Sequence, residues 1–173
     1  MEKYIPDIYQ KNIYAINYDN LKSRGIKNLL FDLDNTIAPI FDHHVSEDAT
    51  NLFKFLKSKK FNIIIVSNSL DSRVSSFARE LKVEYLSNAK KPKNTKLLKL
   101  INDYKFEIDK TAIIGDSMMD DVVVGNSVGI TTILTDQLTR HEFPFAKIKR
   151  IKEKRIQKKL RDNNLFTKGR YYE

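Results

Sequence analysis

The sequence predicts an α/β domain with a mostly parallel sheet. After residue 25 the chain repeats one pattern, in which a short apolar run is followed by a polar turn and then by apolar residues at helical spacing. This alternation is typical of parallel strands covered by helices. With 173 residues, 41% of them hydrophobic and 31% charged, the chain fits one ordinary globular domain.

The predicted strands are short runs rich in branched apolar residues, which suit a buried, pleated surface. They cover residues 26–31, 61–66, 83–86, 111–114 and 130–134.

The first two predicted helices have clear boundary residues. Gly25 can end a short helix over residues 19–24. Ser46 can cap a second helix that runs to Lys60. Its expected buried stripe consists of Leu52, Phe53, Phe55 and Leu56.

The later helices of the alternation follow the same rules. Asp71 can cap a helix that runs to Lys82, and Thr95 can open another that runs to Tyr104. A last helix of this alternation is expected over residues 118–126, between the final two strands.

Polar residues collect just after the predicted strands. They are Asp32, Asp34, Asn35 and Thr36, then Ser67 and Asn68, then Lys90 and Lys91, then Gly115, Asp116 and Asp121. Each group alone is ordinary turn chemistry. However, the carboxyl ends of parallel strands share one edge of the sheet, so these groups should meet. Carboxylates gathered there would repel one another unless a cation joined them, and Mg²⁺ is the usual cation beside phosphate.

These motifs resemble those of the haloacid dehalogenase (HAD) superfamily. The matching residues are Asp32-x-Asp34-Asn35-Thr36, Ser67, Lys91-Pro92 and Gly115-Asp116-x-x-x-x-Asp121. The Thr139-Arg140 pair, the basic segment and the terminal Tyr171-Tyr172-Glu173 are more similar to subclass IIIA phosphatases of the YqeG type, which are similar to phosphatidylglycerophosphate phosphatases. The resemblance implies a Rossmann-like three-layer α/β/α fold and a Mg²⁺-dependent phosphatase acting on phosphate monoesters.

The resemblance also implies a role for each residue. Asp32 would be the nucleophile that forms an aspartyl-phosphate, and Asp34 the general acid and base. Lys91 would add a positive charge beside the phosphoryl group. The implied phosphate contacts are Ser67, Asn68 and Asn35. The implied metal residues are Asp32, Asp34 through its backbone carbonyl, Asp116, and Asp121, which would orient the metal shell or Lys91. Asp120 and Lys90 remain alternatives to Asp121 and Lys91.

The spacing of the motifs leaves no room for an inserted cap domain. Eleven residues separate Asp34 from Ser46, and 23 separate Ser67 from Lys91, whereas a domain needs roughly 50. We therefore expect an N-terminal extension over 1–25, a capless phosphatase domain over 26–144 and a basic helix and tail over 145–173. An open site suits a phosphate on a bulky carrier, such as a phospholipid.

The net charge of +9 is concentrated in one C-terminal segment. Nine Lys or Arg lie between Phe145 and Arg161, against the single acid Glu153. The first interpretation is a helix docked on its own domain with a solvated basic face. Contact with an anionic membrane is a second interpretation, and RNA or ribosome binding a third. No apolar run approaches the ~20 residues of a membrane span, so we expect a cytoplasmic protein, with peripheral membrane contact left open.

Two other functions compete with the phosphatase. One is a phosphoacceptor switch domain, against which Asp34 argues because receivers lack an acid two residues after the acceptor. The other is an RNA-binding protein with a vestigial phosphatase site. The absence of Cys excludes disulfides and thiolate sites. His43 and His44 are expected in a surface loop, and His141 has no partner at metal-ligand spacing.

Overall fold

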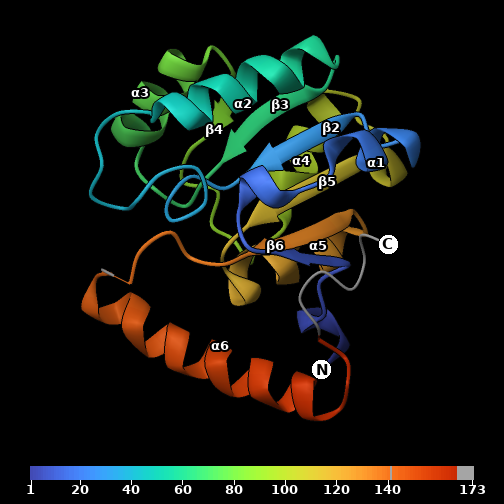
Figure 1. Ribbon diagram of the computed structural model, residues 1–173, viewed down its shortest axis with the longest axis vertical. Helices are drawn as coiled ribbons and strands as arrows, with labels where there is room; N and C mark the ends of the chain where they lie inside the picture. The colour runs from blue at the N-terminus through green and yellow to red at the C-terminus, as the bar shows by residue number, and fades with distance from the viewer. Residues whose placement is uncertain (141, 167–173) are drawn as a thin grey trace.

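A six-stranded parallel sheet forms the centre of the protein (Figure 1). The computed structural model describes residues 1–140 and 142–166. The strands are β1 (Ile8–Gln10), β2 (Asn28–Phe31), β3 (Asn62–Val66), β4 (Glu84–Leu86), β5 (Thr111–Gly115) and β6 (Thr131–Thr135). Their order is β1-β6-β5-β2-β3-β4, and every neighbouring pair is parallel. The predicted Rossmann-like α/β fold is confirmed.

Helices cover both faces of this sheet. They are α1 (Tyr18–Ser23), α2 (Glu47–Ser58), α3 (Asp71–Leu81), α4 (Thr95–Asp103), α5 (Val123–Val128) and α6 (Pro144–Asp162). Single turns complete the chain: η1 (Glu2–Tyr4), η2 (Ile13–Ala15), η3 (Ile108–Lys110) and the π-helical η4 (Met118–Val122). Among the described residues, none of the helices combines the length and the apolar character needed to cross a bilayer.

Alternation along the strands divides the core into two layers. In β2, Leu29 and Phe31 pack in the cluster that contains the buried sides of α1, α2 and α3. Leu30, between them, packs in a separate cluster with α4 and α5. Successive strand residues point to opposite faces, so strands buried on both sides are apolar throughout.

One strand was missed by the sequence analysis. β1 pairs with β6 in parallel register, with Ile8 opposite Ile133. β1 precedes the repeated alternation of strands and helices, whereas the equally short β4 lies between two predicted helices, so only β4 could be predicted. Residues 1–25, expected as an extension, thus supply an edge of the sheet.

Three details of the predicted helices were wrong. Phe55 on α2 is 42% exposed and lies outside the buried stripe, because the helix turns it away from Phe53 and Leu56. The N-cap of α3 is Leu70, and Asp71 lies in the first turn, where it accepts a hydrogen bond from Ser87. The helix expected over residues 118–126 is divided into η4 and α5.

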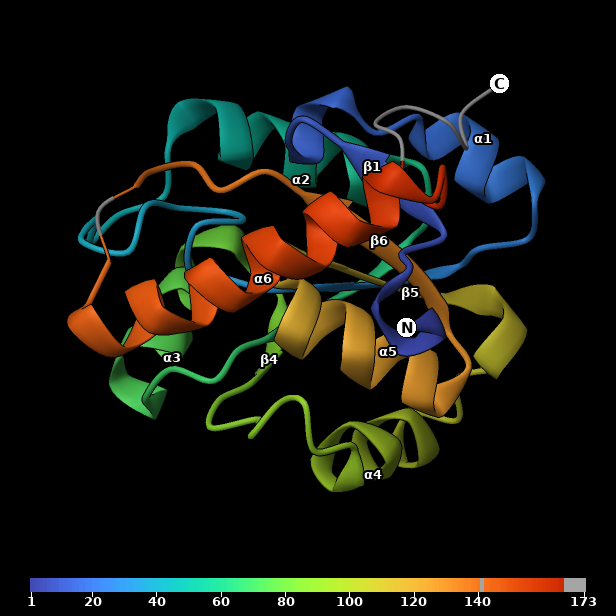
Figure 2. The same cartoon turned by 90° about the horizontal axis from the view of Figure 1, so that it is seen from below.

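Helix α6 docks through one side only. Its buried residues are Glu153 and Leu160, and Leu160 packs with β1, β6 and η4. Figure 2 shows α6 running across β6 and α5. Phe145, Ile148 and Ile151, at spacings of three residues, are 87%, 59% and 52% exposed. The apolar side chains of α6 are therefore buried near the end of the helix and open to solvent near its start.

Candidate active site

One cavity at the carboxyl ends of the strands brings together the residues expected from the motifs. It has a volume of about 130 Å³. Its lining includes Asp32, Asp34, Asn35, Ser67, Asn68, Lys91, Asp116 and Asp121. They meet because β2, β3 and β5 are neighbouring parallel strands that end at the same edge of the sheet.

Lys91 is buried at the centre of this group. Its Nζ donates to Asp32 Oδ1 at 2.7 Å, to Asp121 Oδ1 at 2.6 Å and to the Val66 carbonyl at 2.8 Å. Burial by itself would lower the pKa of Lys91, but the charges of Asp121 and Asp32 outweigh it and raise the pKa above its usual value. The ammonium group therefore stays charged at neutral pH, as a fixed cation beside Asp32.

Three buried carboxylates lie close enough to share one metal ion. Asp32, Asp116 and Asp121 each offer an oxygen within 4.8 Å of the others. The Thr36 hydroxyl lies 3.4 Å from Asp32 Oδ2 and 3.3 Å from Asp116 Oδ1. Thr36 is buried and joins two of the three acids.

The charges in this cavity favour a bound cation. Six carboxylates but only three cationic side chains line it: Asp32, Asp34, Asp116, Asp120, Asp121 and Glu142 against Lys91, Lys149 and Arg150. Burial raises the pKa of Asp32 well above its usual value despite the opposing charge of Lys91. Burial likewise raises the pKa of Asp116 to about 7, against the opposing charge of Arg150. A hard divalent ion with oxygen ligands fits this donor set, because it removes the cost of ionising the acids.

Gly115 allows Asp121 to reach this position. A Cβ at residue 115 would overlap the Asp121 carboxylate and lie 2.7 Å from the Asp121 Cβ. The carboxylate is also held by the backbone N–H of Ser117, which donates to Asp121 Oδ2 at 3.1 Å. Glycine is thus required here for a close approach of a side chain to the backbone.

Asp34 is oriented separately from the three-acid cluster. Arg73 Nε donates to Asp34 Oδ1 at 2.7 Å, and the Ser69 hydroxyl donates to Asp34 Oδ2. Arg73 comes from α3 and was missed by the sequence analysis, because no motif distinguishes it from other surface arginines. The Asp34 carboxylate lies at the rim of the cavity, with 17% of the side chain exposed.

The side chains of the three expected phosphate contacts differ in the hydrogen bonds that they make within the protein. Within the described part of the chain, the Ser67 hydroxyl accepts a hydrogen bond from the Ser69 N–H. Asn68 instead exchanges two bonds with the backbone of Lys91, at 2.7 and 2.9 Å. The Asn35 amide accepts from Thr139 at 3.0 Å and donates weakly to Glu142 at 3.5 Å. Both asparagines are therefore engaged in positioning neighbouring segments.

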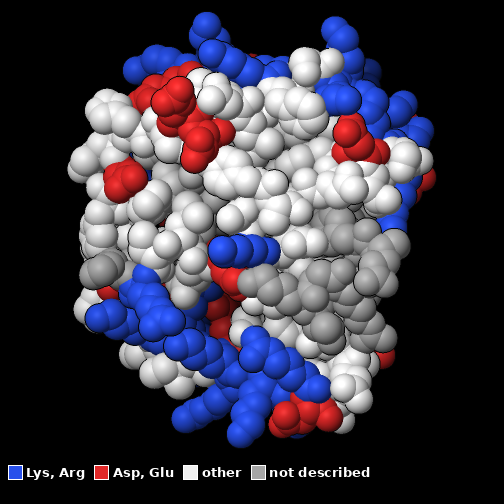
Figure 3. Space-filling view, viewed as in Figure 1, with Lys and Arg blue, Asp and Glu red and all other residues white. Residues whose placement is uncertain are grey.

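Helix α6 and the segment before it complete the wall of the cavity. Arg150 Nη1 donates to the Asp116 carbonyl at 3.0 Å and to Glu153 Oε2 at 2.6 Å. Its Nη2 contacts the Asp116 carboxylate, and its Nε donates to Glu142 Oε1 at 3.0 Å. Glu153 accepts from the Ser117 hydroxyl at 2.8 Å. In Figure 3, acidic side chains lie in a hollow beside the basic side chains over α6. The sequence predicts that this helix docks on its own domain but gives no sign of its contacts with the site.

The residues considered as alternatives to Asp121 and Lys91, and His44, do not join the central group of acids around Lys91. Asp120 is paired with Lys149 of α6. Lys90 is exposed, whereas Lys91 is buried. His44 contacts Glu80 at 3.0 Å in an exposed loop. His141 and the terminal Tyr171-Tyr172-Glu173 lie outside the described residues.

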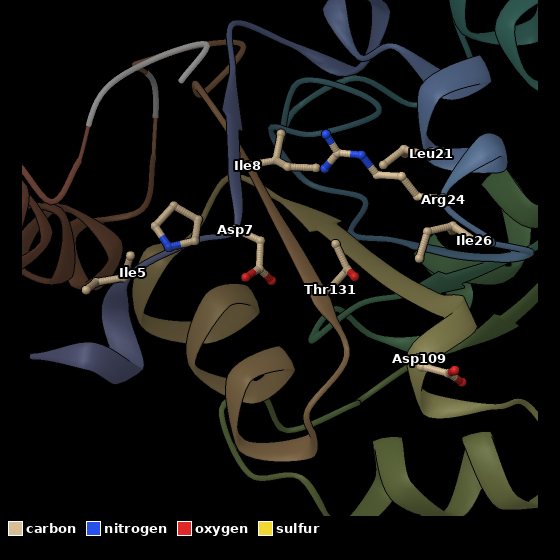
Figure 4. Close-up of a pocket in the computed structure, with 9 residues that line it drawn as sticks. Ile5, Asp7, Ile8, Leu21, Arg24, Ile26, Asp109 and Thr131 are labelled. Atoms are coloured by element: carbon tan, nitrogen blue, oxygen red, sulfur yellow. The ribbon is translucent and has the colours of Figure 1, made fainter. Parts of the chain in front are cut away.

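A further cavity, of about 520 Å³, lies at the opposite end of the strands (Figure 4). Ile8 and Thr131 open their strands there, and Arg24 extends toward Ile8. Asp7 is engaged by Thr132, whose N–H donates to it at 2.8 Å. This cavity is remote from the motif residues, and its lining residues, all of them among those described, include no comparable cluster of buried acids.

Comparison with known families identifies relatives along most of the chain. Residues 1–139 match the family described as "Mitochondrial PGP phosphatase". The chain is 28% identical over 158 residues to "Probable phosphatase YqeG" of Bacillus subtilis, which covers 91% of this chain and 92% of that protein. It is 26% identical over 151 residues to "Phosphatidylglycerophosphate phosphatase 1, chloroplastic/mitochondrial" of Arabidopsis thaliana, covering 82% of this chain and 43% of that protein.

Solved structures share the fold. A HAD superfamily (subfamily III A) hydrolase from Legionella pneumophila superposes with a TM-score of 0.54 and 18% identity, over 72% of this chain and 76% of that one. The 3-deoxy-D-manno-octulosonate 8-phosphate phosphatase of Moraxella catarrhalis, solved with magnesium ion, phosphate ion and KDO, superposes with a TM-score of 0.53 and 21% identity, over 72% and 76%.

Proposed function

Because the chain belongs to the Mitochondrial PGP phosphatase family and is a phosphatase of the HAD superfamily, we propose that it hydrolyses phosphate monoesters through an aspartyl-phosphate on Asp32. The observation that carries this proposal is the contact of Asp32 with the buried cation Lys91, inside a cluster of three acids. A carboxylate beside a fixed positive charge can approach an anionic phosphate that it would otherwise repel.

Each residue of the cavity has a separate role in phosphoryl transfer. Asp32 attacks phosphorus, and the bond between phosphorus and the leaving oxygen breaks. Asp34, fixed by Arg73, donates a proton to that oxygen. It then removes a proton from a water that attacks the phosphorus of the aspartyl-phosphate, and the bond between phosphorus and the Asp32 oxygen breaks to release inorganic phosphate. Lys91 and the Ser67 hydroxyl stabilise the charge on the phosphoryl oxygens. Asn68 holds the backbone of Lys91 in place.

Mg²⁺ is the metal that we propose for the site. Asp32, Asp116 and the backbone carbonyl of Asp34 would hold it, with Asp121 orienting the metal ligands or Lys91. When bound, the ion screens the repulsion between the nucleophile and the substrate. The excess of carboxylates in the cavity and the oxygen-only donor set support this choice.

The substrate that we propose is phosphatidylglycerophosphate or another bulky phosphate ester. The name of the Arabidopsis relative supports the lipid, and the chain spans 43% of that relative's length. Residues 32–91, all of them described, contain α2, β3, α3 and β4 and no inserted domain over the cavity. The capless layout therefore leaves room for a large carrier. The switch-domain and RNA-binding alternatives have no observation in their favour.

The first experiment is a phosphate-release screen with Mg²⁺ on lipid, nucleotide, sugar and phosphopeptide substrates. Asp32→Asn should abolish release while the fold stays intact, because the change removes the nucleophile but keeps the side-chain shape. Asp109→Asn, at an exposed acid, is the matched control and should keep wild-type turnover. Turnover near the wild-type level in Asp32→Asn would reject the mechanism.

Peripheral contact with an anionic membrane is the second part of the proposal. On α6 the exposed Phe145, Ile148 and Ile151 share a surface with exposed basic residues. Apolar and basic side chains on one helix face suit an anionic lipid surface, where each Lys or Arg is worth about 1 kcal/mol.

The test of this contact uses two sets of charge substitutions. The first set replaces Lys152, Lys154, Lys158 and Lys159 on α6 by Gln. Its matched control replaces Lys54, Lys60, Lys99 and Lys105, which are equally exposed on or just after α2 and α4. Only the first set should lower binding to phosphatidylglycerol vesicles and turnover of the lipid substrate there, while sparing a soluble ester. Equal loss in both sets would exclude a specific role for α6.

A further inference from the structure

A larger cavity continues the candidate active site past Asp34. Its volume is about 720 Å³, against about 130 Å³ for the cavity that contains Asp32 and Lys91. The two cavities share Asp34, Ile40 and Ser69 in their linings. The small one has room for a phosphoryl group, and the large one begins at the residue proposed to protonate the leaving oxygen.

Phenylalanine side chains supply most of the apolar wall of the large cavity, whose polar wall includes serine and histidine side chains. Phe41 and Phe143 meet edge to face with ring centroids 5.5 Å apart, although they are far apart in the sequence. Each is more than half exposed, at 55% and 56%. Phe77 of α3 and Ile40 complete the apolar lining. We call these four side chains the Phe41 groove. Paired exposed aromatic rings at the mouth of a cavity are typical of ligand sites.

Arg73 connects this groove to Asp34. Its guanidinium donates to the carbonyls of Pro39 and Asp42 at 3.2 and 2.6 Å, on either side of Phe41. The same group donates to Asp34 at 2.7 Å and lies 4.9 Å from the centre of the Phe77 ring. One side chain therefore positions the proposed acid, the loop that carries Phe41 and the floor of the groove.

We propose that the Phe41 groove binds the apolar alcohol part of the substrate, which leaves when the phosphate ester is cleaved. The inference rests on the proposed function, because the phosphoryl group must lie at Asp32 and the leaving oxygen at Asp34. The substituent on that oxygen then extends away from Lys91, into the cavity that opens beside Asp34. The exposed rings of Phe41 and Phe143 offer this substituent an apolar surface.

The groove also lies beside the exposed apolar part of α6. Phe143 immediately precedes this helix, and Phe145 is 87% exposed. Phe143 therefore places one wall of the groove at the start of this helix. A small hydrophilic alcohol would leave the aromatic pair exposed and gain nothing from it.

The test compares ethyl phosphate with decyl phosphate below its micellar concentration. Binding to the 173-residue Asp32→Asn protein with Mg²⁺, measured by titration calorimetry, should be at least about tenfold tighter for decyl phosphate, equivalent to about 1.4 kcal/mol. Adding Phe41→Ala or Phe143→Ala should each weaken decyl phosphate binding about 5–10-fold, and ethyl phosphate less than about twofold, because only the chain contacts the rings.

Two control variants decide where the chain binds. Ile148→Ala with Ile151→Ala removes exposed apolar groups from α6, and Leu98→Ala removes one from α4. Both should leave decyl phosphate binding unchanged. If the α6 variant lost as much affinity for decyl phosphate as the groove variants, the proposal would be overturned. Equal affinity for the two esters in the protein with an unchanged groove would also overturn it.

Turnover of ethyl phosphate by the protein with Asp32 intact separates this inference from the proposed function. Hydrolysis of ethyl phosphate without any preference for decyl phosphate would keep the proposed function and reject the groove. Failure to hydrolyse either ester, even with decyl phosphate bound, would reject the proposed function and with it the leaving-group role of the groove.

Discussion

Arg150 of α6 donates to the Asp116 backbone carbonyl at 3.0 Å and also to the Asp116 carboxylate. The C-terminal helix is thereby attached to the end of β5, inside the cavity of the candidate site. The side chain of Arg150 is 17% exposed, and those of Asp116 and Glu153 are 3% exposed. Asp116 and Glu153 raise the pKa of Arg150 above its usual value although burial opposes this, so the cation is permanent.

Removing this guanidinium should destabilise the metal-free protein. Arg150→Ala leaves buried carboxylates without their counter-charge, which typically costs about 3–5 kcal/mol. Arg150→Lys should recover part of this loss, because an ammonium group keeps the charge but not the forked geometry. Urea unfolding with and without Mg²⁺ measures both changes. Arg155→Ala, at an exposed position of α6, is the control, and a loss of the same size there would contradict the prediction.

Asp34→Asn should keep phosphate binding and lose turnover. General acid and base assistance is worth about 10²–10⁴-fold, and it matters most for poor leaving groups. We therefore expect a large loss on an alkyl phosphate and a smaller loss on an aryl phosphate with an acidic alcohol. The turnover number and the affinity for inorganic phosphate should be measured on the same variant. An unchanged rate on the alkyl ester would require another role for Asp34.

Gly115→Ala should abolish activity through Asp121. The added methyl group would overlap the Asp121 carboxylate, so Asp121 must move and its 2.6 Å contact with Lys91 must break. Gly25→Ala is the matched control, since nothing lies within 4 Å of a Cβ there. Its φ of +94° predicts a loss of about 1–2 kcal/mol in unfolding free energy but normal turnover. Normal turnover in Gly115→Ala would contradict the close approach.

Mg²⁺ affinity should rise with pH up to about 7. Burial raises the pKa of Asp116 to about 7, so below this pH a proton must leave before the carboxylate can bind a cation. The apparent affinity should fall by up to about tenfold per pH unit below 7 and level off above it. Calorimetric titrations in two buffers with different ionisation enthalpies count the protons released. Affinity that is constant from pH 5.5 to 8.5, with no proton release, would refute this linkage.

The raised pKa of Asp116 also predicts how the unfolding free energy of the metal-free protein depends on pH. The folded chain holds the Asp116 proton more tightly than the unfolded chain, whose pKa is near 3.8. The raised pKa of Asp116 therefore stabilises the folded state fully below pH 3.8, and this stabilisation is lost as the pH rises toward 7. Asp116→Asn should remove this part of the dependence, which thermal unfolding between pH 4 and 8 can measure.

The sequence alone determined the strands β2 to β6 and the group of residues at their carboxyl ends. The apolar runs of β2, β3, β5 and β6 are readable because both faces of the sheet are buried there, and β4 follows from its place between two predicted helices. All of these parallel strands end at the same edge of the sheet. Asp32, Lys91 and Asp116 could therefore be placed together without coordinates. Strand β1 could not be found, because it precedes the repeated alternation of strands and helices, whereas the equally short β4 lies between two predicted helices.

Only the tertiary structure decided which side chains support that group. Arg73 and Arg150 lie on helices whose sequences show ordinary surface charges, and their partners Asp34 and Asp116 are 39 and 34 residues away. The pairing of Phe41 with Phe143 depends on the same long-range packing. A local pattern records how a segment folds on itself, whereas these contacts depend on how separate segments pack against one another, which no local period or motif contains.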